Sequence, residues 1–221
     1  MATNNALKIT VNNGAPKGDK YYNNTAQNYE KRRKKQDWWH VEQRELRGLL
    51  KTLPENLSVV DIPFGTGRFV LDYLERGYSV SGLDVSSHMI RTAGEILGDS
   101  FVDVDAITGD ATDLPYKDEE FDLLVSTRFL RDIVTLKVAK KILSEFSRVT
   151  KKYAIIQLGQ NLGDDMRPDE NGTMGGSFSA QEIDELLLEY NFRVIEKRLV
   201  HSLPNDNSEI FHMLCEKVPA S

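Results

Sequence analysis

Three acidic residues follow apolar segments in the first half of the chain. Asp61 precedes a turn with glycines at positions 65 and 67, Asp84 ends the run SVSGLD 23 residues later, and Asp110 ends VDAITGD. In an open α/β sheet, ligands bind beyond the carboxyl ends of the strands, so residues at these positions are candidates for binding. A carboxylate about 20 residues after a glycine turn can accept hydrogen bonds from both hydroxyls of a ribose. The spacing therefore indicates a nucleoside.

The glycine turn itself points away from a dinucleotide. Dinucleotide sites usually carry GxGxxG, in which the third glycine lets a helix approach closely and face a pyrophosphate. Here Gly65-Thr66-Gly67 is followed by Arg68-Phe69-Val70, so the third glycine is missing. The acids at the end of the first and third runs would also repel a diphosphate. A ligand with a positive centre fits this turn better than NAD does.

Short apolar runs alternate with helical patterns and predict the scaffold that positions these residues. The spacing predicts parallel strands over 57–62, 79–84, 104–110, 121–127 and 153–158, with helices over 68–75, 86–97 and 134–149 between them. A capping box, Ser179 with Glu182, opens a further helix, and two strands over 192–200 and 208–217 end the chain. This order predicts an α/β fold: a doubly wound, seven-stranded, mostly parallel sheet with an antiparallel last strand.

The flanking segments divide the chain into three parts. Residues 1–20 are polar and predict a flexible N-terminal arm. Residues 21–54 predict a helical cap whose apolar stripe, which includes Trp39 and Leu46, ends at Pro54 and packs on the main domain of residues 55–221. The polar, glycine-rich stretch 159–177 is long for a simple connection and predicts a functional loop.

Composition limits the classes of ligand and compartment. The chain has 221 residues and a formal net charge of −6, which favours a small ligand and does not favour nucleic acid or an anionic membrane. A single cysteine, Cys215, excludes an intrachain disulfide framework, and neither CxxC spacing nor a histidine cluster predicts a metal site. No apolar run reaches the roughly 20 residues that span a bilayer, and the start lacks a leader pattern, so we expect a cytoplasmic protein.

Five segments follow one another in the order VVDIPFGTG, GLDVSSHMI, TGDATDLPY, FDLLVST and ILSEFSRVTKKYAIIQL. In this order they resemble the class I S-adenosylmethionine-dependent methyltransferases, and the resemblance covers about residues 55–217. The resemblance implies S-adenosylmethionine (SAM) as cofactor and S-adenosylhomocysteine (SAH) as product. It also implies that Asp61, Gly65 and Gly67 line the methionine part, with Asp61 near the ammonium, and that Asp84 holds the ribose hydroxyls.

The same resemblance implies which residues contact the adenine and the sulfonium of the cofactor. Val85 and Met89 would pack on the adenine, and Asp110 would accept a hydrogen bond from its amino group, with Ala111 beside it. Thr127, which follows the fourth strand, would close the site beneath the sulfonium.

Two features depart from the family pattern or extend it. Pro63 and Phe64 stand where the family commonly has Gly-Cys; we expect the turn to tolerate Pro63 and Phe64 to border the methionine pocket. The segment 21–39 resembles the helical cap of small-molecule methyltransferases. The resemblance makes Tyr21, Tyr29 and either Arg32 or Arg33 candidates for a lid over the methionine carboxylate.

The resemblance implies an enzyme that transfers a methyl group from SAM to O or N of a small-molecule acceptor by in-line displacement. Candidates for catalytic roles near the acceptor are Thr127, Arg128 and Arg131. Two alternatives stay open: a SAM-binding protein without methyl transfer, and a tRNA or protein methyltransferase recruited by the basic run 31–35, which otherwise is a solvated helix face. The pattern is compatible with a monomer or a homodimer.

Overall fold

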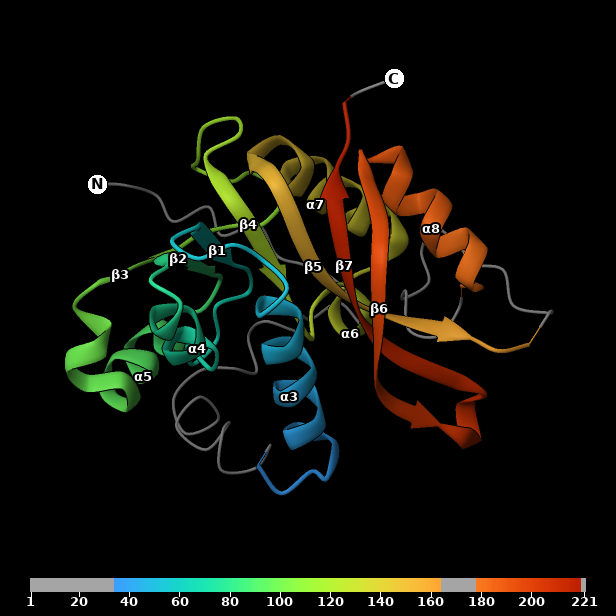
Figure 1. Cartoon of the computed structure of the whole chain (residues 1–221), viewed down its shortest axis with the longest axis horizontal. Helices are drawn as coiled ribbons and strands as arrows, with labels where there is room; N and C mark the ends of the chain where they lie inside the picture. Colours follow the sequence, from blue (N-terminus) through green and yellow to red (C-terminus); the bar gives the residue numbers. More distant parts are fainter. Residues whose placement is uncertain (1–33, 164–177, 220–221) are drawn as a thin grey trace.

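Within residues 34–163 and 178–219, the part of the chain that the computed structural model describes, seven strands form one sheet in the order β3-β2-β1-β4-β5-β7-β6 (Figure 1). The strands are β1 (Ser58–Asp61), β2 (Ser79–Asp84), β3 (Val104–Thr108), β4 (Phe121–Ser126), β5 (Thr150–Asn161), β6 (Phe192–Leu203) and β7 (Ser208–Lys217). Neighbours from β3 to β5 are parallel, and β7 lies between β5 and β6, antiparallel to both. The predicted doubly wound sheet with an antiparallel last strand is confirmed.

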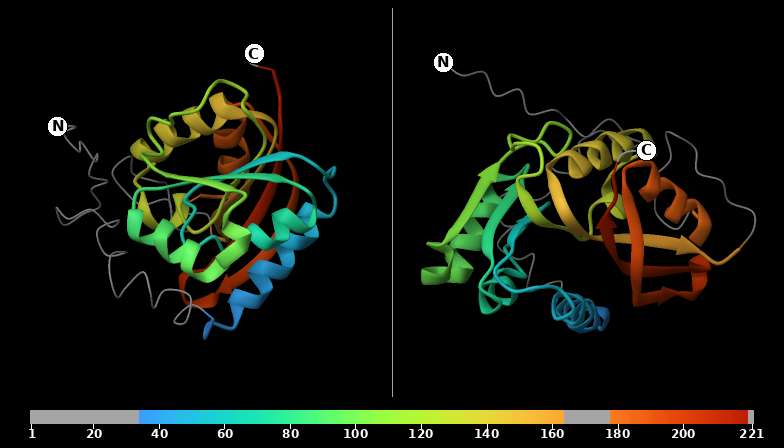
Figure 2. Two further views of the ribbon diagram at one scale, coloured as in Figure 1. Left: turned by 90° about the vertical axis from the view of Figure 1, so that its left-hand side faces the viewer. Right: turned by 45° about the horizontal axis from the view of Figure 1, so that its top comes forward.

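Helices cover both faces of this sheet (Figure 2). One face carries α3 (Trp38–Leu50), α4 (Val70–Glu75) and α5 (Ser87–Leu97), and the other carries α6 (Leu130–Ile133), α7 (Leu136–Val149) and α8 (Ala180–Glu189). Two 3₁₀ segments, η2 (Gly98–Phe101) and η3 (Pro204–Asp206), follow α5 and β6. Successive strand residues alternate between the two cores, as Val59 and Val60 do, because side chains of a strand point to opposite faces.

The helix before β1 is part of the core. Leu46, Leu49 and Leu50 of α3 are buried and share one apolar cluster with Val59 of β1 and Leu214 of β7. The described part of the predicted cap therefore packs on the sheet, as its apolar stripe predicted. Residues 21–33, and with them the lid candidates Tyr21, Tyr29, Arg32 and Arg33, lie outside the described residues, so the division between cap and domain stays a prediction.

The start of the helix after β4 differs from its predicted position for an identifiable reason. The helix predicted from residue 134 begins at Leu136, because Thr135 is its N-cap and accepts a hydrogen bond from the Val138 N–H at 3.4 Å. Val134 is buried in an extended conformation, so it continued the apolar stripe without being helical. The capping box of Ser179 and Glu182 at the start of α8 is confirmed.

β5 extends beyond its predicted run of residues 153–158. Gly159 and Gln160 continue the ladder and pair with Ile210 and Glu209 of β7, so the backbone hydrogen bonds of this polar stretch are satisfied within the sheet. The predicted loop over 159–177 thus begins after Asn161, and its residues 164–177 lie outside the described part.

Candidate functional site

The glycine turn after β1 is built on two left-handed backbone positions. Gly65 and Gly67 have φ of +58° and +68°, a region that residues with a Cβ rarely adopt. A Cβ on Gly67 would also lie 2.7 Å from Leu97 Cδ1, so this glycine lets the turn pack against α5. Pro63 is accommodated in the turn, and the Ile62–Pro63 peptide is cis.

Asp84, at the end of β2, ties this turn to the start of α5. Its Oδ2 accepts a hydrogen bond from the Gly65 N–H at 2.8 Å, and its Oδ1 accepts one from the Ser86 N–H at 2.8 Å. Burial raises the pKa of Asp84 to about 6, and the two N–H donors limit that rise. Because each carboxylate oxygen can accept a second hydrogen bond, Asp84 keeps capacity for ligand hydroxyls.

Asp110 presents an unsatisfied acceptor one strand further along the sheet. Its Oδ1 accepts hydrogen bonds from the N–H and the Oγ1 of Thr112, at 2.8 and 2.9 Å. Its Oδ2 is buried and has no hydrogen-bond partner within the described part of the chain. A buried acceptor without a partner is costly unless a ligand donates to it, so this oxygen fits an amino group.

Asp61 is buried at the end of β1, with 2% of its surface exposed. Burial is the largest effect and raises the pKa of Asp61 to about 8. The hydrogen bond that Tyr73 Oη donates at 3.1 Å lowers this pKa. The negative charge of Asp84 raises it further, and the positive charge of Arg68 lowers it. Asp61 is therefore largely protonated at neutral pH in the ligand-free protein. A positive ligand group beside it would favour its ionised form.

A pH dependence of stability follows from Asp61. An unfolded aspartate has a pKa of about 3.9, and Asp61 in the folded state has one of about 8, so the folded state holds an extra proton between these values. The resulting stabilisation is complete below about pH 4 and is lost as the pH rises through about 8. We expect the melting temperature of the ligand-free wild type to fall by several degrees relative to Asp61→Asn between about pH 6 and pH 9. Parallel melting curves for the two proteins across this range would contradict the assignment.

A buried carboxylate on α3, which the sequence analysis missed, joins three further parts of the sheet edge. Glu42 is fully buried and forms ion pairs with Arg68, in the glycine turn, and with Arg128, just after β4. Arg128 Nε lies 3.0 and 2.9 Å from the two carboxylate oxygens of Glu42. Gln157 of β5 donates to Glu42 Oε1 at 2.6 Å, and the ring of His212 of β7 lies 3.0 Å from the Glu42 backbone oxygen.

The charges around Glu42 explain why it stays ionised. Burial alone would raise its pKa, but the guanidinium groups of Arg128 and Arg68 outweigh burial and lower it to about 2. Burial lowers the pKa of His212 to about 4, so this imidazole is neutral at pH 7. Glu42 therefore carries a negative charge between two buried guanidinium groups.

Two tryptophans at the start of α3 stack on the same arginines. The guanidinium of Arg68 lies 3.4 Å from the ring centroid of Trp39, and that of Arg128 lies 3.9 Å from the ring centroid of Trp38. Trp38 also stacks on His201 of β6, with ring centroids 5.3 Å apart. Helix α3 is thus fixed to both the glycine turn and the end of β4.

The comparisons with known proteins agree with this geometry. Residues 59–153 match the family described as "Methyltransferase domain". The matched segment contains the glycine turn, Asp84 and Asp110. The demethylmenaquinone methyltransferase of Renibacterium salmoninarum is 37% identical over 93 residues, which are 42% of this chain and 36% of the relative. The chain thus spans about a third of the length of this curated relative.

Solved structures share the fold of this chain. The magnesium protoporphyrin IX methyltransferase of Synechocystis PCC 6803 superposes with a TM-score of 0.66 at 15% identity, covering 91% of this chain and 98% of that one. The cyclase SpnF superposes with a TM-score of 0.67 at 16% identity, covering 83% and 84%. The fold is therefore that of class I methyltransferases, and proteins with other activities also use it.

The fold brings most of the predicted cofactor residues to the carboxyl ends of neighbouring strands. Strand register pairs Asp61 with Gly82 and Asp84 with Thr108, so the ends of β1, β2 and β3 adjoin. Met89 is buried on α5, and its Cε lies 3.6 Å from the position of a Cβ on Gly65. Val85 is partly exposed after β2, and Ala111 is buried in the core on the α7 side.

Phe64 lies in the core. It has 2% of its surface exposed and packs over Gly82 of β2, where a Cβ would lie 2.1 Å from Phe64 Cδ2. Its ring also contacts that of Phe101, with centroids 6.4 Å apart. The glycine at position 82 thus makes room for an aromatic ring where the family pattern has a smaller side chain.

A conservative substitution separates the two roles of Phe64. Because its ring fills a packed space, we expect Phe64→Leu to lower the free energy of unfolding by about 1 kcal/mol and to leave the affinity for SAH within twofold of the wild type. Chemical denaturation and isothermal titration measure the two effects. Weaker SAH binding at unchanged stability would show instead that Phe64 borders the methionine pocket.

The three candidate catalytic residues occupy different environments. Thr127 is partly exposed directly after β4. Arg128 is buried, has φ of +54°, and donates its backbone N–H to Gln157 Oε1 at 2.9 Å. Its side chain forms an ion pair with Glu42. Arg131 is partly exposed on α6. Their catalytic roles stay predictions.

Across residues 34–163 and 178–219, no three His, Cys, Asp or Glu side chains are grouped so that they could hold a metal ion. No helix in these same ranges combines the length and apolar character needed to cross a membrane.

Proposed function

We propose that the protein is a SAM-dependent methyltransferase acting on a small-molecule acceptor. The observation that carries the proposal is the joint placement of the glycine turn, Asp84 and the unsatisfied Asp110 Oδ2 at one edge of a methyltransferase domain. An adenosine offers the matching groups, two ribose hydroxyls and one amino group. The residues present therefore fit SAM.

Each strand end would contribute one contact to the cofactor. Asp84 would accept hydrogen bonds from the ribose hydroxyls, and Asp110 Oδ2 would accept one from the adenine amino group. Asp61, whose pKa burial raises to about 8, would ionise beside the ammonium of the methionine part. Met89 and Val85 would pack on the adenine, and Thr127 would border the reaction centre.

SAM supplies a methyl group made electrophilic by its sulfonium. In the proposed reaction the carbon–sulfur bond would break as a carbon–oxygen or carbon–nitrogen bond forms, and the acceptor would lose its proton to solvent. The protein has to align the acceptor lone pair with the breaking bond and exclude water, and such positioning can supply about 7–11 kcal/mol of the barrier. The names of similar proteins, demethylmenaquinone methyltransferase and magnesium protoporphyrin IX methyltransferase, support a small-molecule acceptor.

We further propose a cytoplasmic setting. The single cysteine, Cys215, is fully buried in the core, and burial raises its pKa, so it remains a protonated thiol that suits a reducing compartment.

Isothermal titration with SAM, SAH and NAD tests the cofactor assignment. We expect SAM and SAH to bind and NAD not to bind; a protein that binds NAD but not SAM would overturn the proposal. Methyl transfer is tested with SAM labelled in its methyl group and a panel of naphthohydroquinones, phenols and amines. SAM binding without label transfer to any of them would favour a SAM-binding protein that does not methylate.

A further inference from the structure

The outer face of α3 carries a row of basic side chains. The exposed residues of the helix after Trp38 are His40, Arg44 and Arg47, and the exposed Lys51 follows at the C-cap. Their spacing of four, three and four residues places all four on one side of the helix, about 5–6 Å apart. The protein has a net charge of −6, so such a row is not expected from composition.

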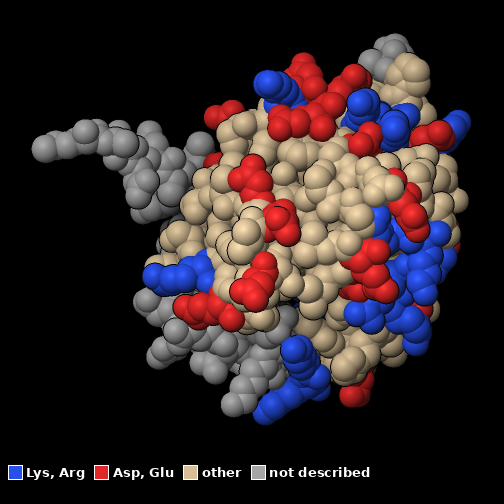
Figure 3. Space-filling view, turned by 60° about the vertical axis from the view of Figure 1, so that its left-hand side comes forward, with Lys and Arg blue, Asp and Glu red and all other residues tan. Residues whose placement is uncertain are grey.

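This row borders a groove between α3 and β6. The groove has a volume of about 660 Å³, and its lining contains the cations Arg44, Arg47, Lys51 and Arg198 and one carboxylate, Glu45. That volume lies within the range of small-molecule sites, about 300–1,000 Å³. In Figure 3, basic side chains gather toward the side of the molecule where α3 and β6 lie, with acidic ones among them.

Gly48 shapes the floor of this groove. It lies inside α3 with an ordinary helical backbone, where glycine is less favourable than alanine. A Cβ at this position would stand 1.8 Å from Arg198 Nη1, so the missing side chain lets the guanidinium of Arg198 lie directly on the helix. Arg198 Nε donates to Glu196 at 2.7 Å, which fixes this guanidinium in the groove.

Carboxylates hold the arginines without using all their donors. Arg44 pairs with Glu45 at 2.7 Å, Arg47 pairs with the buried Asp72, and Arg198 lies 3.9 Å from Glu45. A guanidinium has five N–H donors, so each of these arginines retains donors for a ligand. The groove lining itself has four cations against one carboxylate and contains no apolar side chain.

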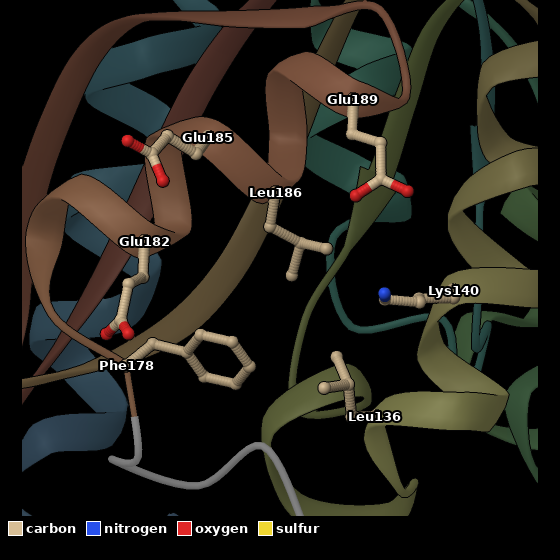
Figure 4. A pocket seen from close by; sticks show the side chains of 7 residues that line it. All are labelled: Leu136, Lys140, Phe178, Glu182, Glu185, Leu186 and Glu189. Atoms are coloured by element: carbon tan, nitrogen blue, oxygen red, sulfur yellow. The ribbon is translucent and has the colours of Figure 1, made fainter. Parts of the chain in front are cut away.

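The chemistry of this lining selects among ligands. An amphipathic membrane helix needs exposed apolar residues, whereas the apolar residues of α3 are buried in the core. A second groove, between α7 and α8, has the opposite character: three glutamates and Lys140 surround an apolar floor of Leu136, Phe178 and Leu186 (Figure 4). Guanidinium groups match phosphate oxygens in geometry as well as in charge. The arginines that line the groove between α3 and β6 therefore favour a phosphate ligand.

We infer that the groove between α3 and β6 binds an oligophosphate, that is, two or more linked phosphates of a small molecule. This site lies on the opposite side of α3 from the Glu42 network, and it is independent of the proposed methyl transfer.

Inorganic tripolyphosphate is the probe that tests this inference. We expect it to bind the wild type in isothermal titration and to raise the melting temperature. The double variant Arg44→Glu with Lys51→Glu should lose at least tenfold in affinity. The control, Lys137→Glu with Lys141→Glu, makes a similar charge change on exposed positions of α7 and should bind as the wild type does. Equal losses in both double variants, or no binding to the wild type, would overturn the site.

Gly48→Ala gives a test that does not depend on charge. Its methyl group displaces the guanidinium of Arg198 while improving helix propensity. We expect an unchanged or higher melting temperature with severalfold weaker tripolyphosphate binding; unchanged binding would contradict the role of Arg198. Binding to single-stranded RNA of 4 and about 12 nucleotides, and to anionic lipid vesicles, is measured in parallel. If the affinity rises steeply with RNA length, or if vesicles bind preferentially, the groove is part of an extended polyanion-binding surface. Either result would contradict a site for a small oligophosphate.

Discussion

Glu42→Gln is expected to melt about 10 °C below the wild type. The substitution removes the negative charge that two buried guanidinium groups, those of Arg68 and Arg128, contact. Breaking a buried ion pair by removing one partner typically costs about 3–5 kcal/mol, because the remaining charge is left in a poorly solvated place. In a protein of this size, 1 kcal/mol corresponds to about 2–4 °C in melting temperature. Differential scanning calorimetry measures the shift.

Glu45→Gln is the matched control for this substitution. Glu45 lies on the same helix, one turn nearer the C-terminus, and its side chain is 19% exposed. It pairs with Arg44, which is 70% exposed, so this ion pair contributes little to stability. We expect a change of no more than about 2 °C. If Glu42→Gln behaves like Glu45→Gln, the network does not fix α3 to the sheet.

The Glu42→Gln protein should also bind SAH more weakly at temperatures where it is folded. Arg68 belongs to the turn that carries Gly65 and Gly67, so freeing its guanidinium loosens the backbone that faces the cofactor. Glu42→Asp is expected to recover part of the affinity, since it keeps the charge. This recovery distinguishes electrostatic positioning of the turn from packing of α3.

Asp84→Ala should weaken SAH binding by about 2–3 kcal/mol, or roughly 30- to 150-fold. Two effects add: the ribose hydroxyls lose a charged acceptor, and the N–H groups of Gly65 and Ser86 lose the oxygens that orient the turn and the start of α5. Isothermal titration measures the affinity, and thermal unfolding shows whether the variant is folded.

Asp105→Ala is a suitable control for Asp84→Ala. Asp105 lies on the neighbouring strand β3 and is exposed, so its removal should leave SAH affinity within twofold of the wild type. A folded Asp84→Ala protein with the affinity of the wild type would refute the ribose assignment.

The sequence predicted the sheet because each element signals itself locally. Short apolar runs, helix periodicity and the capping box at Ser179 are read from neighbouring residues, and the alternation of strands and helices limits the topology. Asp61 and Asp84 end β1 and β2 as predicted, whereas β3 ends at Thr108, two residues before Asp110. The position of all three acids near the carboxyl ends of neighbouring strands was therefore predictable. The glycines of the turn were also predictable, since left-handed backbone positions require this residue type.

The partners of charged side chains were not predictable in the same way. Arg128, Gln157 and His212 stand 86, 115 and 170 residues from Glu42. No local pattern selects these three residues from the other polar and charged residues of the chain. One signal was available: Glu42 falls three residues after Trp39 and four before Leu46, within the apolar stripe of α3. A carboxylate in such a stripe must find buried partners.

The sequence by itself thus determined which acidic residues stand at or just beyond the carboxyl ends of the first three strands, and what a ligand there would have to be, because backbone geometry follows from local chemistry. The tertiary structure decided that Phe64 packs over Gly82, that Arg128 pairs with Glu42, and that Arg198 lies against Gly48. These outcomes depend on which side chains the fold brings within contact distance, and contacts between distant parts of the chain exist only after the sheet has formed.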